Sequence, residues 1–181
     1  MGTAAATLYL AFDGVLHPNL VSFNGRRLPQ LHAGGHAFFE NSVILEQVIE
    51  SCPQTQVVLH TLWVPALGYR RVLEMLPQEV RLHVIGATWR GTRGLRARLR
   101  PTGARRSWLD EDLIRRRPLQ PVLVDCDYRQ IAPALTDSSC IVDGWYGLAS
   151  AGACDRLIAL LVADDVGSPL QRSVSVDRVT A

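Results

Sequence analysis

Acidic side chains end two apolar runs of this 181-residue chain. Asp13 follows residues 8–12 and precedes Gly14, and the pair Asp125 and Asp127 follows residues 121–124. A strand that stops at an acid and turns through glycine displays a carboxylate at its carboxyl end, where open α/β sheets bind ligands. Paired acids can also be ordinary turn residues. An apolar strand that ends in Asp-x-Asp favours a metal site, because Mg²⁺ prefers hard oxygen ligands.

Two further groups stand at the ends of expected elements. Thr61 ends the run of residues 56–61, and Arg105 and Arg106 begin a helical segment, residues 104–117. A threonine that caps the next helix and a solvated helix surface are the alternative interpretations of these groups. Arg105 is placed first because leucines follow it at helical spacing, and Arg106 is its substitute.

The elements that must position these groups alternate between strands and helices. Short apolar runs with turn signals nearby predict buried strands at residues 7–12, 56–61, 81–85, 121–124 and 140–142. Helices are predicted at residues 42–51 (capped by Asn41 or Ser42), 65–76, 104–117, 128–135 and 153–162. The alternation predicts an α/β fold with a Rossmann-like parallel sheet and helices on both faces. The strands that end at Phe12, Thr61 and Val124 should be neighbours in this sheet.

In order, these groups resemble the motifs of the haloacid dehalogenase (HAD) superfamily of phosphatases. Residues 8–18, Leu-Tyr-Leu-Ala-Phe-Asp-Gly-Val-Leu-His-Pro, are similar to the first motif, Asp-x-Asp-Gly-[Thr/Val]-Leu. Residues 57–63, Val-Val-Leu-His-Thr-Leu-Trp, are similar to the strand end that carries the second. Residues 121–127 resemble the fourth motif, and residues 140–148 resemble the closing strand with its Gly-Leu turn. The resemblance covers most of the chain and implies a HAD-type fold.

The resemblance implies a role for each position. Asp13 is the acid/base carboxylate, Thr61 the hydroxyl that binds a phosphoryl oxygen, and Arg105 the cation that neutralises the phosphoryl group. Mg²⁺ is the implied cofactor, bound directly by Asp125 and with help from Asp127. The residues expected to contact substrate are Gly14, Thr61, Leu62, Arg105 and Arg106, and those expected to hold the metal are Asp13, Asp125 and Asp127.

One position departs from the family's pattern. The first aspartate of the family is the nucleophile, and here that position holds Ala11. Without it no aspartyl-phosphate forms, and losses of a covalent nucleophile run to roughly 10⁴–10⁶ in rate. The chain is therefore expected to be an inactive form of a Mg²⁺-dependent phosphohydrolase. The alternative is a natural pseudophosphatase that binds a phosphate group or an RNA end.

Two origins of Ala11 stay open. One is an engineered replacement of aspartate, which the intact remaining motifs favour. The other is natural loss, with which Val64 agrees because relatives often have arginine there. A single sequence does not decide between them.

The remaining segments complete the expected organisation. Residues 1–166 are expected to form one HAD-like domain, in which residues 18–39 are a mobile flap or minimal cap over the crevice, with no large cap. Residues 167–181 are polar and predict a flexible tail. Residues 90–106 are rich in arginine and are either a solvated loop or a basic face that steers a phosphorylated substrate.

Composition bounds the class of protein. Apolar residues make up 48% of the chain, and the formal net charge of +2 does not by itself indicate nucleic-acid binding. All 19 basic residues are arginine, and the four cysteines lack the spacing of a disulfide framework or metal site. No signal peptide and no membrane-spanning run are expected. The sequence predicts a cytoplasmic protein whose partner is a phosphorylated small molecule or a nucleic-acid end, with no indication of oligomeric state.

Overall fold

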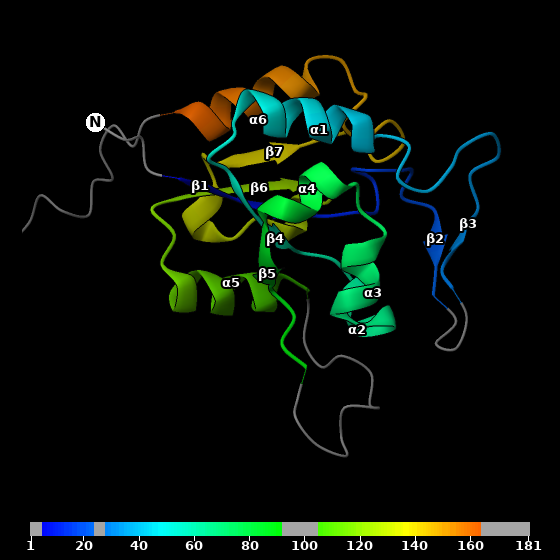
Figure 1. Cartoon of the computed structure of the whole chain (residues 1–181), viewed down its shortest axis with the longest axis horizontal. Helices are drawn as coiled ribbons and strands as arrows, with labels where there is room; N and C mark the ends of the chain where they lie inside the picture. The colour runs from blue at the N-terminus through cyan, green and yellow to red at the C-terminus, as the bar shows by residue number, and fades with distance from the viewer. Residues whose placement is uncertain (1–4, 24–27, 92–104, 164–181) are drawn as a thin grey trace, which may run out of the picture.

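A five-stranded parallel sheet, in the order β5-β4-β1-β6-β7, forms the centre of the molecule (Figure 1). The structure is a computed structural model that describes residues 5–23, 28–91 and 105–163. The strands are β1 (Ala6–Leu10), β4 (Gln56–Leu59), β5 (Val84–Ala87), β6 (Gln120–Asp125) and β7 (Ser139–Ile141). This confirms the predicted α/β fold, and β4, β1 and β6 are neighbours as expected.

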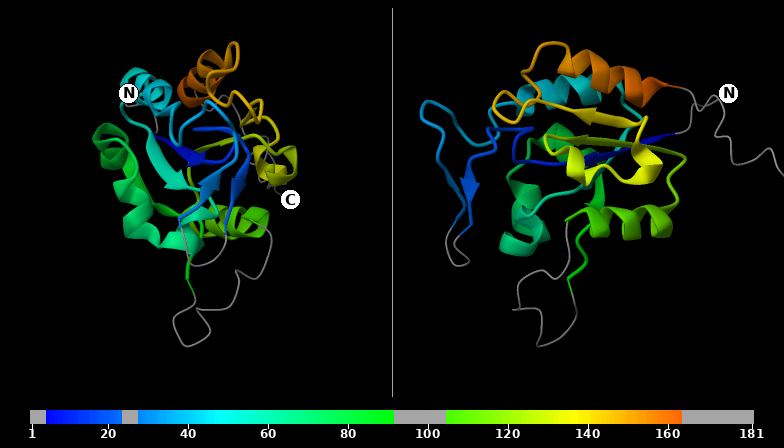
Figure 2. Two further views of the ribbon diagram at one scale, coloured as in Figure 1. Left: turned by 90° about the vertical axis from the view of Figure 1, so that its right-hand side faces the viewer. Right: turned by 180° about the vertical axis from the view of Figure 1, so that it is seen from behind.

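Helices cover both faces of the sheet. The helices are α1 (Ser42–Ser51), α2 (Trp63–Leu67), α3 (Tyr69–Glu74), α4 (Gln78–His83), α5 (Arg105–Arg116) and α6 (Ala153–Val162). Figures 1 and 2 show α1 and α6 side by side over one face and α5 on the other.

The central strands are apolar on both faces because successive side chains point in opposite directions. Leu8 and Leu10 of β1 belong to the core beneath α1 and α6, whereas Tyr9 belongs to the core beneath α5. The neighbouring strands repeat this alternation, with Leu123 on the α5 side. Sheets buried on both faces need such continuous apolar strands, which is why the sequence pattern identified them.

A buried polar contact fixes α5 on its face of the sheet. The Tyr9 hydroxyl donates to Asp112 Oδ2 over 3.2 Å, and Arg116 Nε lies 2.7 Å from the same oxygen. Asp112 also pairs with Arg115. Burial and the adjacent Asp112 charge raise the pKa of Tyr9, so the phenol stays protonated and remains a donor. These contacts position the helix that carries Arg105 at its first residue.

Three predicted elements were wrong in detail. The helix expected at residues 65–76 is two helices, because Gly68 adopts φ 88°, a conformation that ends α2. The helix expected at residues 128–135 is two 3₁₀ turns, η2 (Tyr128–Gln130) and η3 (Pro133–Leu135). Residues 81–83, expected in a strand, belong to α4.

The helix α1 begins after Asn41, whose side chain does not cap it. Instead the Asn41 amide donates to the carbonyl oxygens of Val15 and Tyr146, over 3.1 and 2.9 Å. The side chain that was predicted to cap the helix therefore connects the turn after β1 to the turn after β7.

The expected flap contains a short antiparallel hairpin, β2 (Val21–Ser22) and β3 (Gln30–Leu31). The hairpin stands off the body near the carboxyl ends of the strands (Figure 2). Its mobility stays a prediction. The predicted tail and residues 92–104 of the arginine-rich segment lie outside the described residues.

Candidate active site

The predicted site residues converge at the carboxyl ends of β1, β4 and β6. The chain leaves β1 toward β4 on one side and returns to β6 on the other, which makes this edge a topological switch point. A cavity of about 550 Å³ lies here. Its lining residues are Asp13, Asn19, Leu62, Arg105, Arg106, Cys126, Asp127, Arg129 and Gln130. Five of the predicted site residues are among them, and Ala11, Gly14, Thr61 and Asp125 are not.

Gly14 lets the turn after β1 pack against the end of β6. Its φ is +74°, and a Cβ placed there would lie 2.3 Å from Cys126 Sγ. The Cys126 thiol donates to the Asp13 carbonyl oxygen over 3.5 Å. A glycine is therefore needed both for the backbone conformation and for the close approach of these two strands' ends.

Two buried side chains hold the Asp13 carboxylate. Trp63 Nε1 donates to Asp13 Oδ1 over 2.8 Å, and His17 Nε2 lies 3.1 Å from the same oxygen. The Asp13 side chain is 20% exposed, whereas that of His17 is fully buried. Asp13 is thus held from the protein side while it lines the cavity.

Arg105 joins three elements through its guanidinium. Nη1 donates to the His60 carbonyl oxygen over 3.0 Å, and Nη2 donates to Asp125 Oδ1 over 3.2 Å. Asp125 Oδ2 lies 2.8 Å from Nη1 as an ion pair, with angles that do not make a hydrogen bond. The backbone N–H of Asp127 also donates to Asp125 Oδ1, over 3.0 Å.

Asp125 is a fully buried carboxylate. Burial raises its pKa, and the Arg105 charge and the hydrogen bonds to the carboxylate oppose that rise. Arg105 is therefore the cation that favours the ionised form of Asp125 against the effect of burial.

The other charged groups of the cavity are less constrained. Arg106 is 42% exposed, and its Nε lies 3.9 Å from Asp110 Oδ2. The Asp127 carboxylate accepts from Arg129 Nε over 3.0 Å and from Gln130 Nε2 over 3.1 Å. Slight desolvation acts upward on the pKa of Asp127, but the hydrogen bonds from Arg129 and Gln130 outweigh it and lower that pKa.

Over residues 7–153 the chain matches the family described as the HAD domain in Swiss Army Knife RNA repair proteins. The chain belongs to this HAD family. No curated protein and no solved structure matches it. HAD domains are typically hydrolases and generally use Mg²⁺. None of the described helices is long and apolar enough to cross a membrane.

Thr61, predicted to bind a phosphoryl oxygen, makes a local contact instead. It is buried, and its Oγ1 accepts from the Trp63 backbone N–H over 3.3 Å. This is the local turn contact of a hydroxyl with the backbone two residues on, and it does not cap α2, whose first flanking residue is Leu62. The adjacent Leu62, rather than Thr61, lines the cavity.

Ala11, the predicted nucleophile position, is completely buried, and its N–H donates to the Val124 carbonyl oxygen over 3.1 Å. Its methyl group can neither attack phosphorus nor bind a cation. Among the described residues, no three His, Cys, Asp or Glu side chains form a group that could hold a metal ion. Because Asp125 is paired with Arg105 and Asp127 with Arg129, the donors present do not fit a tightly bound Mg²⁺.

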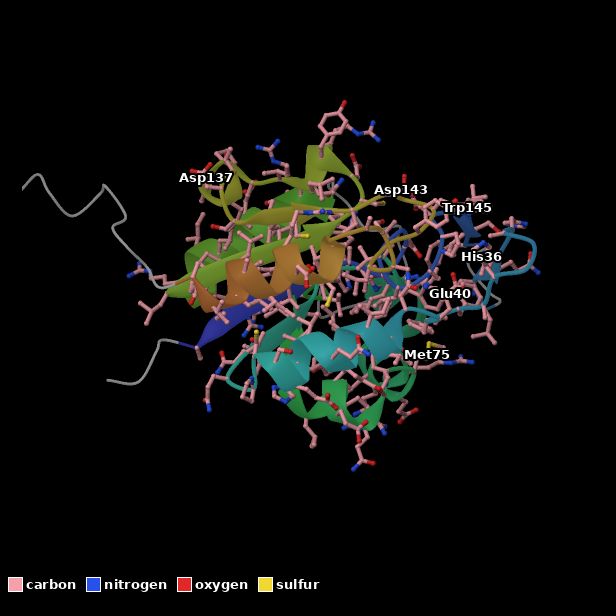
Figure 3. The ribbon with its side chains drawn as sticks, turned by 90° about the horizontal axis from the view of Figure 1, so that it is seen from above. His36, Glu40, Met75, Asp137, Asp143 and Trp145 are labelled. Atoms are coloured by element: carbon pink, nitrogen blue, oxygen red, sulfur yellow. The ribbon has the colours of Figure 1, made fainter. Side chains whose placement is uncertain are left out.

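The base of the flap is joined to the turn after β7. The rings of His36 and Trp145 meet edge to face with centroids 5.0 Å apart, and His36 Nδ1 lies 2.7 Å from Glu40 Oε1. Figure 3 shows these three side chains near one another at one end of the molecule. The backbone N–H of Asn19, which lines the cavity, donates to the Gly144 carbonyl oxygen over 2.7 Å and so connects the start of the flap to the turn after β7.

Sequence reasoning missed the roles of His17 and Trp63 beside Asp13, and of Arg129 at the cavity. The first two stood inside the quoted motifs, His17 four residues after Asp13 and Trp63 two residues after Thr61. Their meeting on one carboxylate oxygen depends on the pairing of β1 with β4, which no local pattern contains.

Arg105→Met should destabilise the protein because it leaves Asp125 buried without its cation. Removal of one partner of a buried ion pair costs about 3–5 kcal/mol. We expect a loss of that size at neutral pH and a smaller one in acid, where protonation discharges Asp125. The measurement is urea denaturation across pH. R105M/D125N should recover most of the loss, and equal stability of the R105M variant and the unsubstituted chain would contradict the interpretation.

Gly14→Ala should destabilise the protein by more than Gly35→Ala. Both positions have positive φ, which costs an L-residue roughly 1–2 kcal/mol, but a Cβ at Gly35 meets nothing within 4 Å. The extra loss of stability in Gly14→Ala over Gly35→Ala measures the clash with Cys126, and this difference should shrink in the G14A/C126A variant. Thermal unfolding of these variants provides the comparison, and equal losses in the two single variants would exclude the close approach.

Proposed function

We propose that this HAD domain recognises the phosphoryl group of a phosphorylated substrate and, in a form with aspartate at position 11, hydrolyses it. The observation that carries the proposal is the meeting of Asp13, Arg105 and Arg106 on one cavity at the switch point of the sheet. Guanidinium groups bind phosphate through charge-assisted, bidentate hydrogen bonds. The match to a family of RNA repair domains supports a substrate of this chemistry.

Each group has a proposed task in this reaction. Arg105, fixed by His60 and Asp125, presents a cation whose position is set before substrate arrives. Arg106 is more exposed and can turn toward a phosphate without leaving a buried partner uncompensated. Asp13 gives a proton to the leaving oxygen as the phosphorus–oxygen bond breaks, and later takes one from the attacking water.

The nucleophilic step has no residue in this chain. We propose that the Ala11 protein holds the substrate and does not turn it over, since an aspartyl-phosphate needs a carboxylate at this position. The Mg²⁺ requirement is proposed for the form with aspartate at position 11. There the new carboxylate would stand beside Asp125 and supply the missing anionic donor.

Ala11→Asp should create a metal-dependent phosphatase. The assay uses an aryl phosphate and a panel of 5′- and 3′-phosphorylated nucleotides, with Mg²⁺ and with chelator. We expect turnover at least about 10⁴-fold above the Ala11 chain, because the covalent route is restored. Ala11→Asn is the matched control, with similar size and no nucleophile. A folded A11D protein that is inactive on the whole panel would overturn the hydrolase proposal.

A second candidate function is a binding module for a phosphorylated nucleic-acid end. Three arginines, Arg105, Arg106 and Arg129, line the cavity against two carboxylates, Asp13 and Asp127. This excess of positive charge, together with Ala11, favours phosphate retention without chemistry. An aspartate codon at position 11 in the natural gene would exclude a natural module.

The binding proposal predicts that the Ala11 chain prefers a short single-stranded RNA with a terminal phosphate over the same RNA with a hydroxyl end. Charge-assisted contacts to phosphate should make the preference about tenfold, and affinity should fall steeply with salt. Fluorescence anisotropy measures both. Arg106→Gln should remove most of the preference, and Arg81→Gln on α4, outside the cavity, should not. Equal affinity for both RNAs would contradict end recognition.

A further inference from the structure

Asp13 Oδ1 already receives two donors from the protein. Trp63 Nε1 lies 2.8 Å and His17 Nε2 lies 3.1 Å from this one oxygen. A carboxylate oxygen has two lone pairs, so these contacts occupy Oδ1. Among the described residues, Oδ2 receives no such donor.

The backbone at the end of the flap determines which ring nitrogen of His17 carries the hydrogen. The Phe39 N–H donates to His17 Nδ1 over 3.4 Å, so Nδ1 is an acceptor and carries no hydrogen. The other ring nitrogen, Nε2, therefore carries the N–H that reaches Asp13. His17 is fully buried, so solvent does not compete for this hydrogen bond.

Aromatic packing fixes the direction of the second donor. Trp63 is 1% exposed. Its ring lies 5.8 Å from Phe23 of the flap and 5.1 and 5.3 Å, between centroids, from Phe38 and Phe39. His17 packs edge to face on the same two phenylalanines. Both donors are thus held by Phe38 and Phe39 at the end of the flap segment, and Trp63 is also held by Phe23 within it.

We propose that His17 and Trp63 are positioning residues that hold Oδ1 of Asp13, so that Oδ2 alone exchanges the proton with the substrate's leaving oxygen and with water. The inference rests on the proposed function, because it concerns the acid/base step. A carboxylate held by one oxygen keeps the other in a constant direction, and orientation of this kind can be worth on the order of 100-fold in rate. The flap reaches Asp13 through the same two side chains.

The first experiment uses the Ala11 chain and needs no activity. The protein has four tryptophans, so a ¹⁵N-labelled sample gives four indole N–H resonances, and Trp63→Phe identifies one of them. Asp13→Ala should move that resonance upfield by removing its acceptor, and should leave the resonance lost in Trp145→Phe in place. An unmoved Trp63 resonance would overturn the proposal.

The second experiment measures kinetics in the Ala11→Asp background. His17→Phe keeps the ring packing and removes the donor, and we expect it and Trp63→Phe each to lower kcat about tenfold with KM unchanged. The double variant should lose on the order of 100-fold. His17→Gln, which keeps an N–H donor near Nε2, should restore most of kcat. A purely structural role would lower the folded fraction in all three single variants without this pattern.

Controls separate the outcomes. His83→Phe on α4 and Trp145→Phe, both outside the clamp that His17 and Trp63 form on Asp13, should keep kcat. Equal kcat in the His17 and Trp63 variants and their A11D parent would overturn the positioning role. If A11D has no activity on any substrate, the hydrolase proposal is wrong. The shift of the Trp63 indole resonance then decides by itself whether the clamp holds Asp13.

Discussion

The buried charge of Asp125 is the constraint on which the site depends. A carboxylate at the end of a central strand with no exposed surface requires a cation and hydrogen bonds at fixed positions. Arg105 supplies the cation, and its guanidinium also binds the His60 carbonyl oxygen. One side chain therefore joins the start of α5 to the ends of β4 and β6, and the shape of the cavity follows from this junction.

The same junction explains why α5 must also be held at Asp112, away from its first residue. Tyr9 and Asp112 anchor the helix to β1 through a contact that is itself buried. A shift of α5 along the sheet would move Arg105 away from Asp125 and leave that charge uncompensated. The core contact on one face of the sheet and the ion pair at its edge consequently specify the same helix position.

Much of this arrangement could be predicted from the sequence because the signals are local. Apolar runs identified β1, β4 and β6, and the order of elements placed Asp13 and Asp125 at one edge. The break at Gly68 and the 3₁₀ turns were missed because a short stretch with helical composition does not show where a backbone leaves the helix. The clamp on Asp13 was missed for another reason: His17 and Trp63 belong to segments that only the sheet pairing brings together.

The position of Ala11 affects the chemistry more than the fold. In the described structure Asp125 already has its counter-charge in Arg105, so the site needs neither a metal ion nor a second carboxylate to be electrostatically balanced. A carboxylate at position 11 would add a negative charge to this balance, and a cation would then be required to offset it. Among the described residues no three His, Cys, Asp or Glu side chains form a group that could hold a metal ion, which agrees with this charge balance. The pairing of Arg105 with Asp125 and with the His60 carbonyl oxygen therefore keeps the ends of β4 and β6 together with alanine at position 11.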